Sequence, residues 1–189
     1  FKKETAKLRW VEYSESELSQ NSDGVNSKVD EAENILVCIH GIIGDTAQQA
    51  EFSRAFYSEK PTEEKAHDLV LTFDYENLDT PIETIAANFK KALENAGITE
   101  KSGKKITILS HSMGGLVSRY LIEQIREGDN LIDQLYMFGT PNGGSVFGNL
   151  PAYRDRLILL LTVGLNFGKA WLGHVGVALS MVNKVLVGS

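Results

Sequence analysis

The chain has 189 residues, of which 42% are hydrophobic and 23% are charged, and this composition is typical of a globular domain with a buried core. The formal net charge of −6 provides neither the positive surface that nucleic-acid binding needs nor an attraction for anionic lipid headgroups, so we expect no nucleic-acid partner. The single cysteine, Cys38, lies in the apolar run ILVCI, so it is predicted to be a small core residue, in agreement with a reducing compartment.

The first third of the chain begins with charged and polar residues. FKKETAKLRW has no apolar stretch behind its charges, so we expect no secretory signal peptide and a cytoplasmic location. The first residue is Phe rather than Met, and we therefore expect the chain to be a segment of a longer protein. Residues 8–13, LRWVEY, are predicted to form an edge strand, and the polar residues 14–33 are predicted to form a loop.

Strand and helix signals then alternate along the chain. Short apolar runs predict strands at residues 34–40, 68–75, 104–110 and 133–139. Helices are predicted between them, with Asp45 and Gln48 at the start of the first, then over 80–97 and 113–128. This alternation predicts an α/β fold with a mostly parallel, doubly wound sheet, helices on both faces, and a site at the carboxyl ends of the strands.

The helix predicted over residues 80–97 has the clearest boundary signals in the chain. Thr80 and Glu83 have the spacing of a capping box, Pro81 suits the first helical position, and Gly97 suits the residue that ends a helix. Its apolar residues fall on one face, which is predicted to be buried: Ile82, Ile85, Ala86, Phe89, Leu93 and Ala96.

The stretch ILSHSMGG, residues 108–115, places Ser112 between a predicted strand and a predicted helix. So tight a reversal is predicted to force Ser112 into a strained backbone conformation and to lift its hydroxyl out of the sheet. Ser110 and Gly114 are small, as the close approach of strand and helix requires, and Gly115 permits further close packing. This pattern is a nucleophile elbow with Ser in place of the first Gly of G-x-S-x-G. The simpler alternative is that Ser112 only caps the helix.

Two further loops follow predicted strands. In CIHGIIGD, residues 38–45, the His-Gly pair lets the backbone turn inward, so the Ile42 N–H is a candidate donor to an oxyanion. The Met113 N–H, directly after the elbow serine, is the second candidate. The loop MFGTPNGGS, residues 137–145, is predicted to be a rigid turn packed close to the elbow. It is not a phosphate-binding loop, because the Lys and Ser/Thr of that motif are missing.

Together, HGIIGD, SHSMGG and FGTPNGGS resemble the motifs of the α/β-hydrolase superfamily, in its lipase- and esterase-like branch, over roughly residues 33 to 150. They are also similar to hydrolase domains of large multidomain bacterial proteins. The resemblance implies a serine hydrolase of the lipase or esterase type, acting on a lipid-like or apolar acyl ester through an acyl-enzyme on Ser112.

The catalytic acid and base follow the serine in this family, and only one downstream pair has the right order. This pair is Asp155 and His174. Asp133 instead opens its predicted strand at the wrong edge of the sheet. His40, His67 and His111 do not fit the order of the triad. Three alternatives follow. The acid and base lie beyond Ser189, or they are Asp155 and His174, or the protein is a pseudo-enzyme that has kept the elbow and lost its acid and base.

We divide the chain into a hydrolase core, residues 1–150, and an apolar carboxy-terminal segment, residues 151–189. From Leu157 to Asn183 the only charged side chain is that of Lys169. Interior glycines, Asn166, Lys169 and His174 argue against a transmembrane helix. The alternatives are an apolar helical lid over an acyl pocket and ordinary core helices. The segment is also where a membrane surface or a protein partner would dock, and a catalytically inactive docking domain is the rival hypothesis. No cofactor or metal is implied, because no His/Cys/Asp cluster has ligand spacing.

Overall fold

A computed structural model describes residues 6–14, 17–41, 46–54, 67–76, 80–126 and 130–143. They lie almost entirely in the first of the two compact units of the chain, Phe1–Asn142. The elements, in chain order, are strand β1 (Lys7–Tyr13), strand β2 (Leu18–Asn21), helix α1 (Val25–Glu31), strand β3 (Asn34–Ile39), helix α2 (Thr46–Ser53), strand β4 (Leu69–Asp74), helix α3 (Ile82–Asn95), the 3₁₀ turn η2 (Glu100–Ser102), strand β5 (Lys105–His111), helix α4 (Met113–Tyr120), the π-helical turn η3 (Leu121–Ile125) and strand β6 (Gln134–Phe138).

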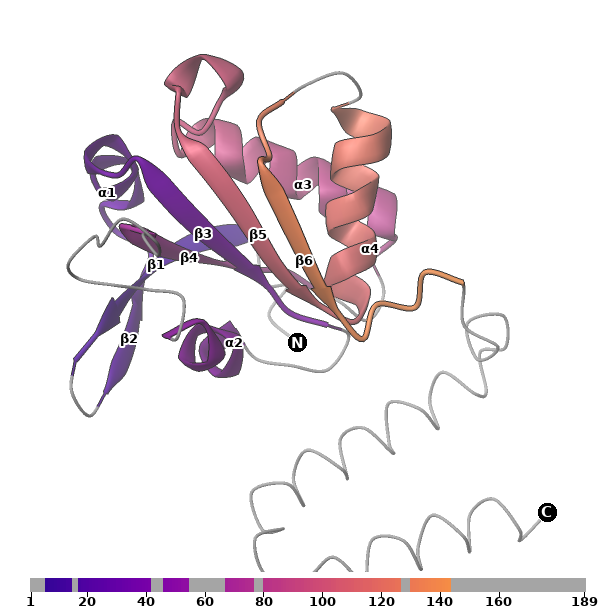
Figure 1. The fold of residues 1–189 in the computed structure, drawn as a ribbon, viewed down its shortest axis with the longest axis horizontal. Coiled ribbons are helices and arrows are strands. Elements are labelled where there is room, and N and C mark those ends of the chain that lie inside the picture. Colours follow the sequence, from indigo (N-terminus) through magenta and orange to yellow (C-terminus); the bar gives the residue numbers. More distant parts are fainter. Residues whose placement is uncertain are drawn as a thin grey trace, which may run out of the picture. The chain divides into compact units, whose positions relative to one another are not determined.

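The strands form one mixed six-stranded sheet in the order β2-β1-β4-β3-β5-β6 (Figure 1). β4, β3, β5 and β6 are parallel, whereas β1 is antiparallel to both β4 and β2. The prediction of a mostly parallel sheet was therefore wrong, because the amino-terminal hairpin β1–β2 joins the parallel strands through Lys7–Trp10. Two strands joined by a short turn pair in the antiparallel sense, because parallel neighbours need a longer crossover segment between them.

Residues 8–13 form a strand as predicted, but β1 lies inside the sheet and β2 is the edge. Residues 14–33 were predicted to be a loop, and this prediction was wrong for β2 and α1. Only Val25 and Val29 of α1 are buried, at the i, i+4 spacing of one helical turn. Such a short apolar pattern is too sparse to stand out among polar residues.

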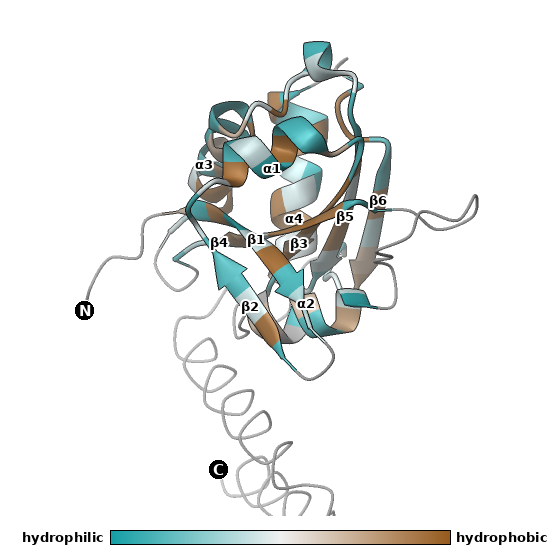
Figure 2. Cartoon of the chain, turned by 90° about the vertical axis from the view of Figure 1, so that its left-hand side faces the viewer, coloured by the Kyte–Doolittle hydropathy of each residue, from teal (hydrophilic) through white to brown (hydrophobic). Residues whose placement is uncertain are grey.

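The core lies on both faces of the sheet. The larger cluster joins one face of the central strands to α1, α3 and α4, and includes Ile35, Phe73, Phe89 and Val117. The smaller cluster joins the other face to Ala50 of α2 and includes the fully buried Cys38. Helices therefore cover both faces, as predicted, and Figure 2 shows the central strands as mainly hydrophobic. Cys38 is a core residue as predicted, and burial raises the pKa of its thiol to about 12.

α3 buries the predicted apolar face, and its end is also as predicted: Gly97 has a φ of 88°, and the Ile98 N–H donates to the Leu93 oxygen over 2.9 Å. The predicted capping box was wrong. Thr80 Oγ1 donates instead to Glu76 Oε2 over 2.5 Å, and Pro81 occupies the cap position without a side-chain bond. The predicted caps of the first helix, at Asp45 and Gln48, concern side chains outside the described set.

The parallel strands bring their carboxyl ends to one edge, and the strand order reverses between β3 and β5. The helix after β3 is α2, which packs on one face, and the helix after β5 is α4, which packs on the other. Their connections diverge, so this is the topological switch point at which open α/β sheets bind ligands. Among the described residues no helix is long and apolar enough to cross a membrane.

Candidate active site

Ser112 stands between β5 and α4, with a φ of 51° and a ψ of −121°. It is the only residue other than glycine with a positive φ in the described part of the chain. The predicted strained reversal is thus confirmed. Strand pairing holds the strained residue, because the Ser112 N–H donates to the Phe138 carbonyl of β6 over 2.8 Å. A backbone conformation of this kind persists only where its surroundings impose it, and such residues cluster at functional sites.

The small residues around the elbow are needed, as the sequence predicted. A Cβ at Gly114 would lie 2.5 Å from the carbonyl oxygen of His40 and 2.7 Å from that of Ile39. A Cβ at Gly115 would overlap the side chain of Thr140. Ser110 is fully buried, and its hydroxyl donates to the Tyr136 carbonyl over 3.0 Å. The start of α4 therefore fits directly against the loops that follow β3 and β6.

The loop after β3 packs against the nucleophile candidate. A Cβ at Gly41 would lie 2.8 Å from the Cβ of Ser112, so only glycine fits there without a shift. The His40 ring is buried and stacks on Tyr75, with 4.3 Å between the ring centroids. Ile42, the predicted oxyanion donor of this loop, lies outside the described residues. The two predicted loops therefore meet at His40, Gly41 and Ser112.

Met113, the other predicted oxyanion donor, is the first residue of α4 and is partly exposed. The N–H groups of a first helical turn have no acceptor within their own helix, and the helix dipole adds partial positive charge at that end. The Met113 N–H thus belongs to the type of group that stabilises an oxyanion.

The loop after β6 also packs against the elbow, as predicted. Gly139 has a φ of 60°, and the chain then brings Thr140 against Gly115. Arg119 of α4 holds this loop, because its Nη1 donates to Asn142 Oδ1 over 3.1 Å. The same guanidinium bonds Glu123, which lowers the pKa of that carboxyl. The carboxylate of Glu123, which follows the elbow in the sequence, is therefore hydrogen-bonded to Arg119.

The three described histidines do not supply a base at Ser112. His40 directs Nδ1 to the Gly41 carbonyl, His67 precedes β4 at the opposite edge, and the His111 ring lies between Gly41 and Gly139. Within the described ranges no histidine is hydrogen-bonded to the Ser112 hydroxyl. Asp155 and His174, the predicted in-chain candidates, lie outside those ranges.

Asp133 lies where the sequence predicted, at the amino end of the strands. Its Oδ2 accepts from the Ile106 N–H at the start of β5 over 2.7 Å. The strand β5 separates this carboxylate from Ser112, so Asp133 has a structural role.

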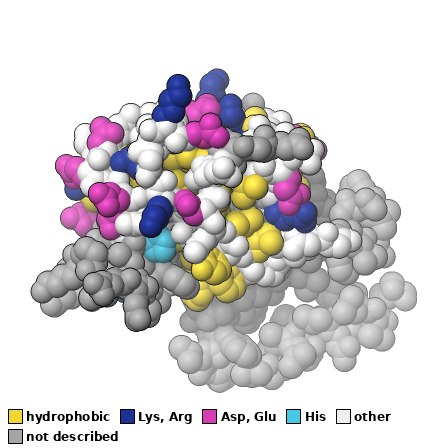
Figure 3. Space-filling model, turned by 45° about the horizontal axis from the view of Figure 1, so that its top comes forward, with side chains coloured by type: hydrophobic (Ala, Val, Ile, Leu, Met, Phe, Trp, Pro, Cys, Tyr) yellow, Lys and Arg dark blue, Asp and Glu magenta, His cyan; other side chains and the backbone are white. Residues whose placement is uncertain are grey.

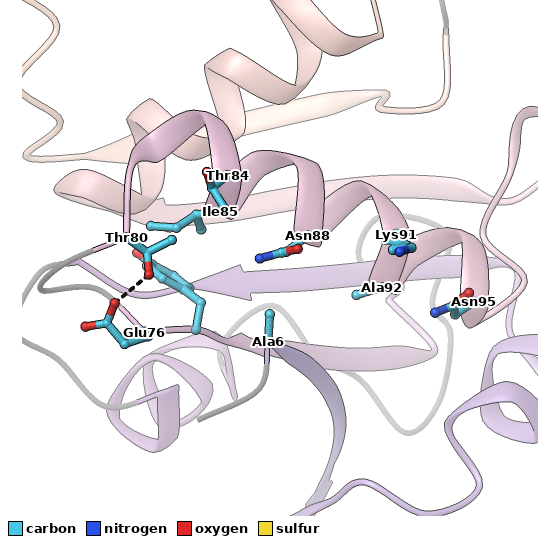
Figure 4. Close-up of a pocket in the computed structure, with 10 residues that line it drawn as sticks. Ala6, Glu76, Thr80, Thr84, Ile85, Asn88, Lys91, Ala92 and Asn95 are labelled. Carbon is cyan, nitrogen blue, oxygen red and sulfur yellow. Dashed lines mark hydrogen bonds between the residues drawn. The ribbon is translucent and has the colours of Figure 1, made fainter. Parts of the chain in front are cut away.

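A pocket of about 430 Å³ opens beside Tyr75, between α3 and the start of β1 (Figure 4). Thr84, Asn88 and Lys91 lie along its α3 wall, and Glu76 lies across from them. No residue of the elbow lines this pocket. Neither the pocket nor a role for Tyr75 was predicted from the sequence, and the available signal was the position of Tyr75 directly after a strand.

The chain belongs to a family described as a domain of unknown function (DUF7379), whose model matches residues 3–187. No curated protein matches the chain.

Proposed function

We propose that this protein is a serine hydrolase of the α/β-hydrolase superfamily, of the lipase or esterase type, with Ser112 as its nucleophile. The observation that carries the proposal is the strained backbone of Ser112 at the switch point of the sheet, with Gly41 packed against its Cβ and Gly114 packed against the backbone after β3. A helix cap or an ordinary turn needs neither this strain nor these close approaches.

The proposed reaction is acyl transfer from a carboxylic ester. Ser112 Oγ attacks the acyl carbon, a base accepts the hydroxyl proton, and the base returns that proton to the departing alcohol. Water then cleaves the acyl-enzyme. The Met113 N–H, and the Ile42 N–H that follows Gly41, are the proposed donors to the oxyanion. The proposed base is either His174, with Asp155 as the acid behind it, or a residue outside residues 1–189.

An apolar acyl group is the proposed substrate. Phe138, whose carbonyl binds the Ser112 N–H, has a side chain that is 43% exposed and makes an edge contact with the exposed Phe52. Exposed aromatic side chains at the edge of the sheet that carries the nucleophile favour an apolar substrate. The predominance of apolar residues from 157 to 183 supports the same substrate class. We also propose a cytoplasmic location and docking of this segment on a membrane or a protein partner.

The test is labelling with a fluorophosphonate probe, which reacts with activated serines. We expect the native protein to be labelled and Ser112→Ala to lose the label. Ser102→Ala is the matched control, because Ser102 lies in η2 and its hydroxyl bonds only locally, to the Thr99 carbonyl. The control should be labelled like the native protein. If the native protein reacts no faster than heat-denatured protein, the docking-domain hypothesis replaces the hydrolase.

A further inference from the structure

Tyr75 and His40 form a buried pair at the start of the loop that packs on Ser112. The Tyr75 hydroxyl donates to the His40 carbonyl over 2.6 Å, and the two rings are stacked. His40 Nδ1 lies 2.7 Å from the Gly41 carbonyl oxygen. A carbonyl oxygen only accepts, so Nδ1 must carry the hydrogen in this contact. Two consecutive peptide carbonyls are thus each held by a side chain.

These two contacts fix the backbone of the last described residues after β3. Gly41 itself lies against Ser112, where a Cβ would be 2.8 Å from the serine Cβ.

We propose that Tyr75 is a positioning residue, which holds the His40–Gly41 backbone of the proposed oxyanion loop against Ser112. This inference rests on the proposed function. Tyr75 acts through His40 and touches neither the substrate nor the nucleophile.

The burial of the pair supports a fixed geometry. Tyr75 is 3% exposed and His40 is 6% exposed. Burial raises the pKa of the Tyr75 hydroxyl, so the hydroxyl remains a donor at neutral pH. The His40 carbonyl also faces Gly114 at the start of α4, which leaves no room for a bulkier residue there. Removal of the Tyr75 hydroxyl takes away a donor from a buried carbonyl and allows this peptide to rotate.

The experiment compares Tyr75→Phe with Tyr13→Phe in the full chain. Tyr13 is the matched control, because its hydroxyl also donates to a backbone carbonyl, that of Ala50, over 2.7 Å, on the α2 side of the sheet. The rate of fluorophosphonate labelling, kcat and KM for a p-nitrophenyl ester, and amide hydrogen exchange of a peptide spanning residues 36–45 are measured. All measurements are made well below the unfolding midpoints.

We expect Tyr75→Phe to lower kcat and the labelling rate about tenfold with KM nearly unchanged, since loss of a complete oxyanion donor lowers turnover by about 10²–10³. Exchange in the peptide should be faster in Tyr75→Phe than in Tyr13→Phe. Equal slowing by both variants, or a native labelling rate in Tyr75→Phe, would overturn the role of Tyr75 and leave the hydrolase intact. Absence of labelling in the native protein would overturn the hydrolase and this inference together.

Discussion

The two edges of the parallel strands are built in opposite ways. At the amino edge, Asp68 Oδ2 accepts from the N–H groups of Glu33 and Asn34 over 2.8 and 2.9 Å, and Asp133 accepts from Ile106 over 2.7 Å. At the carboxyl edge, Ser112 has a strained backbone and Gly41 and Gly114 stand where a side chain would collide.

The amino edge thus uses carboxylates to satisfy backbone donors, which stabilises the ends of strands. Figure 3, with that side of the molecule turned forward, shows acidic and basic side chains interspersed over the described surface. The carboxyl edge holds strain and close backbone contacts that no stability argument requires. The difference fits the proposal that the carboxyl edge carries the active site, and variants at each edge test this contrast.

The largest effect is expected for Gly114→Ala. In an ordinary helix this change stabilises by about 1 kcal/mol. Here the new Cβ would lie 2.5 Å from the His40 carbonyl oxygen and 2.7 Å from that of Ile39, and backbone atoms of this kind limit relaxation. We expect a loss of about 3 kcal/mol in the free energy of unfolding, at the upper end of overpacking effects. Denaturant unfolding measures it.

Gly143→Ala is the control for that change, because no atom lies within 4 Å of a Cβ at Gly143. It should leave the unfolding midpoint nearly unchanged. A Gly114→Ala protein as stable as the native one would show that the elbow packing is loose, and would remove the distinction between the edges.

A smaller effect, of the same sign, is expected for Asp133→Ala at the amino edge. The change removes the acceptor of the Ile106 N–H and should lower the free energy of unfolding by about 1.5 kcal/mol, the size of a hydrogen bond to a charged group. The labelling rate of Ser112 should stay at the native value in the folded protein. A selective loss of labelling without a loss of stability would contradict the assignment of this edge to structure.

The smallest effect has the opposite sign. Ser112→Gly relieves a positive φ that glycine tolerates, so the free energy of unfolding should rise by about 1 kcal/mol while labelling is lost. Ser112→Ala keeps a Cβ at the same φ and should lose labelling without this gain. Equal stability of the two variants, measured by urea unfolding, would show that Ser112 stores little strain.

Local sequence signals predicted the parallel strands and α3 well, because apolar runs and the helix-ending Gly97 act within a few residues. They failed for β2 and α1. β2 is the polar segment LSQN, and it forms a strand because it pairs with β1 rather than because of its composition. The capping box failed for a similar reason, since Thr80 finds the carboxylate of Glu76 outside the helix.

The sequence by itself determined the elbow. A strand, a serine between small residues and a helix are contiguous in residues 105–120, so the order of these elements is a local property of the sequence. Only the tertiary structure decided what surrounds Ser112, because β3 and β5 are neighbours in the sheet but far apart in the chain. That pairing brings Gly41 onto Ser112. The pairing of β3 with β4 likewise brings Tyr75 onto His40, 35 residues away. No periodicity encodes these contacts, because they depend on which strands associate and which faces their helices cover.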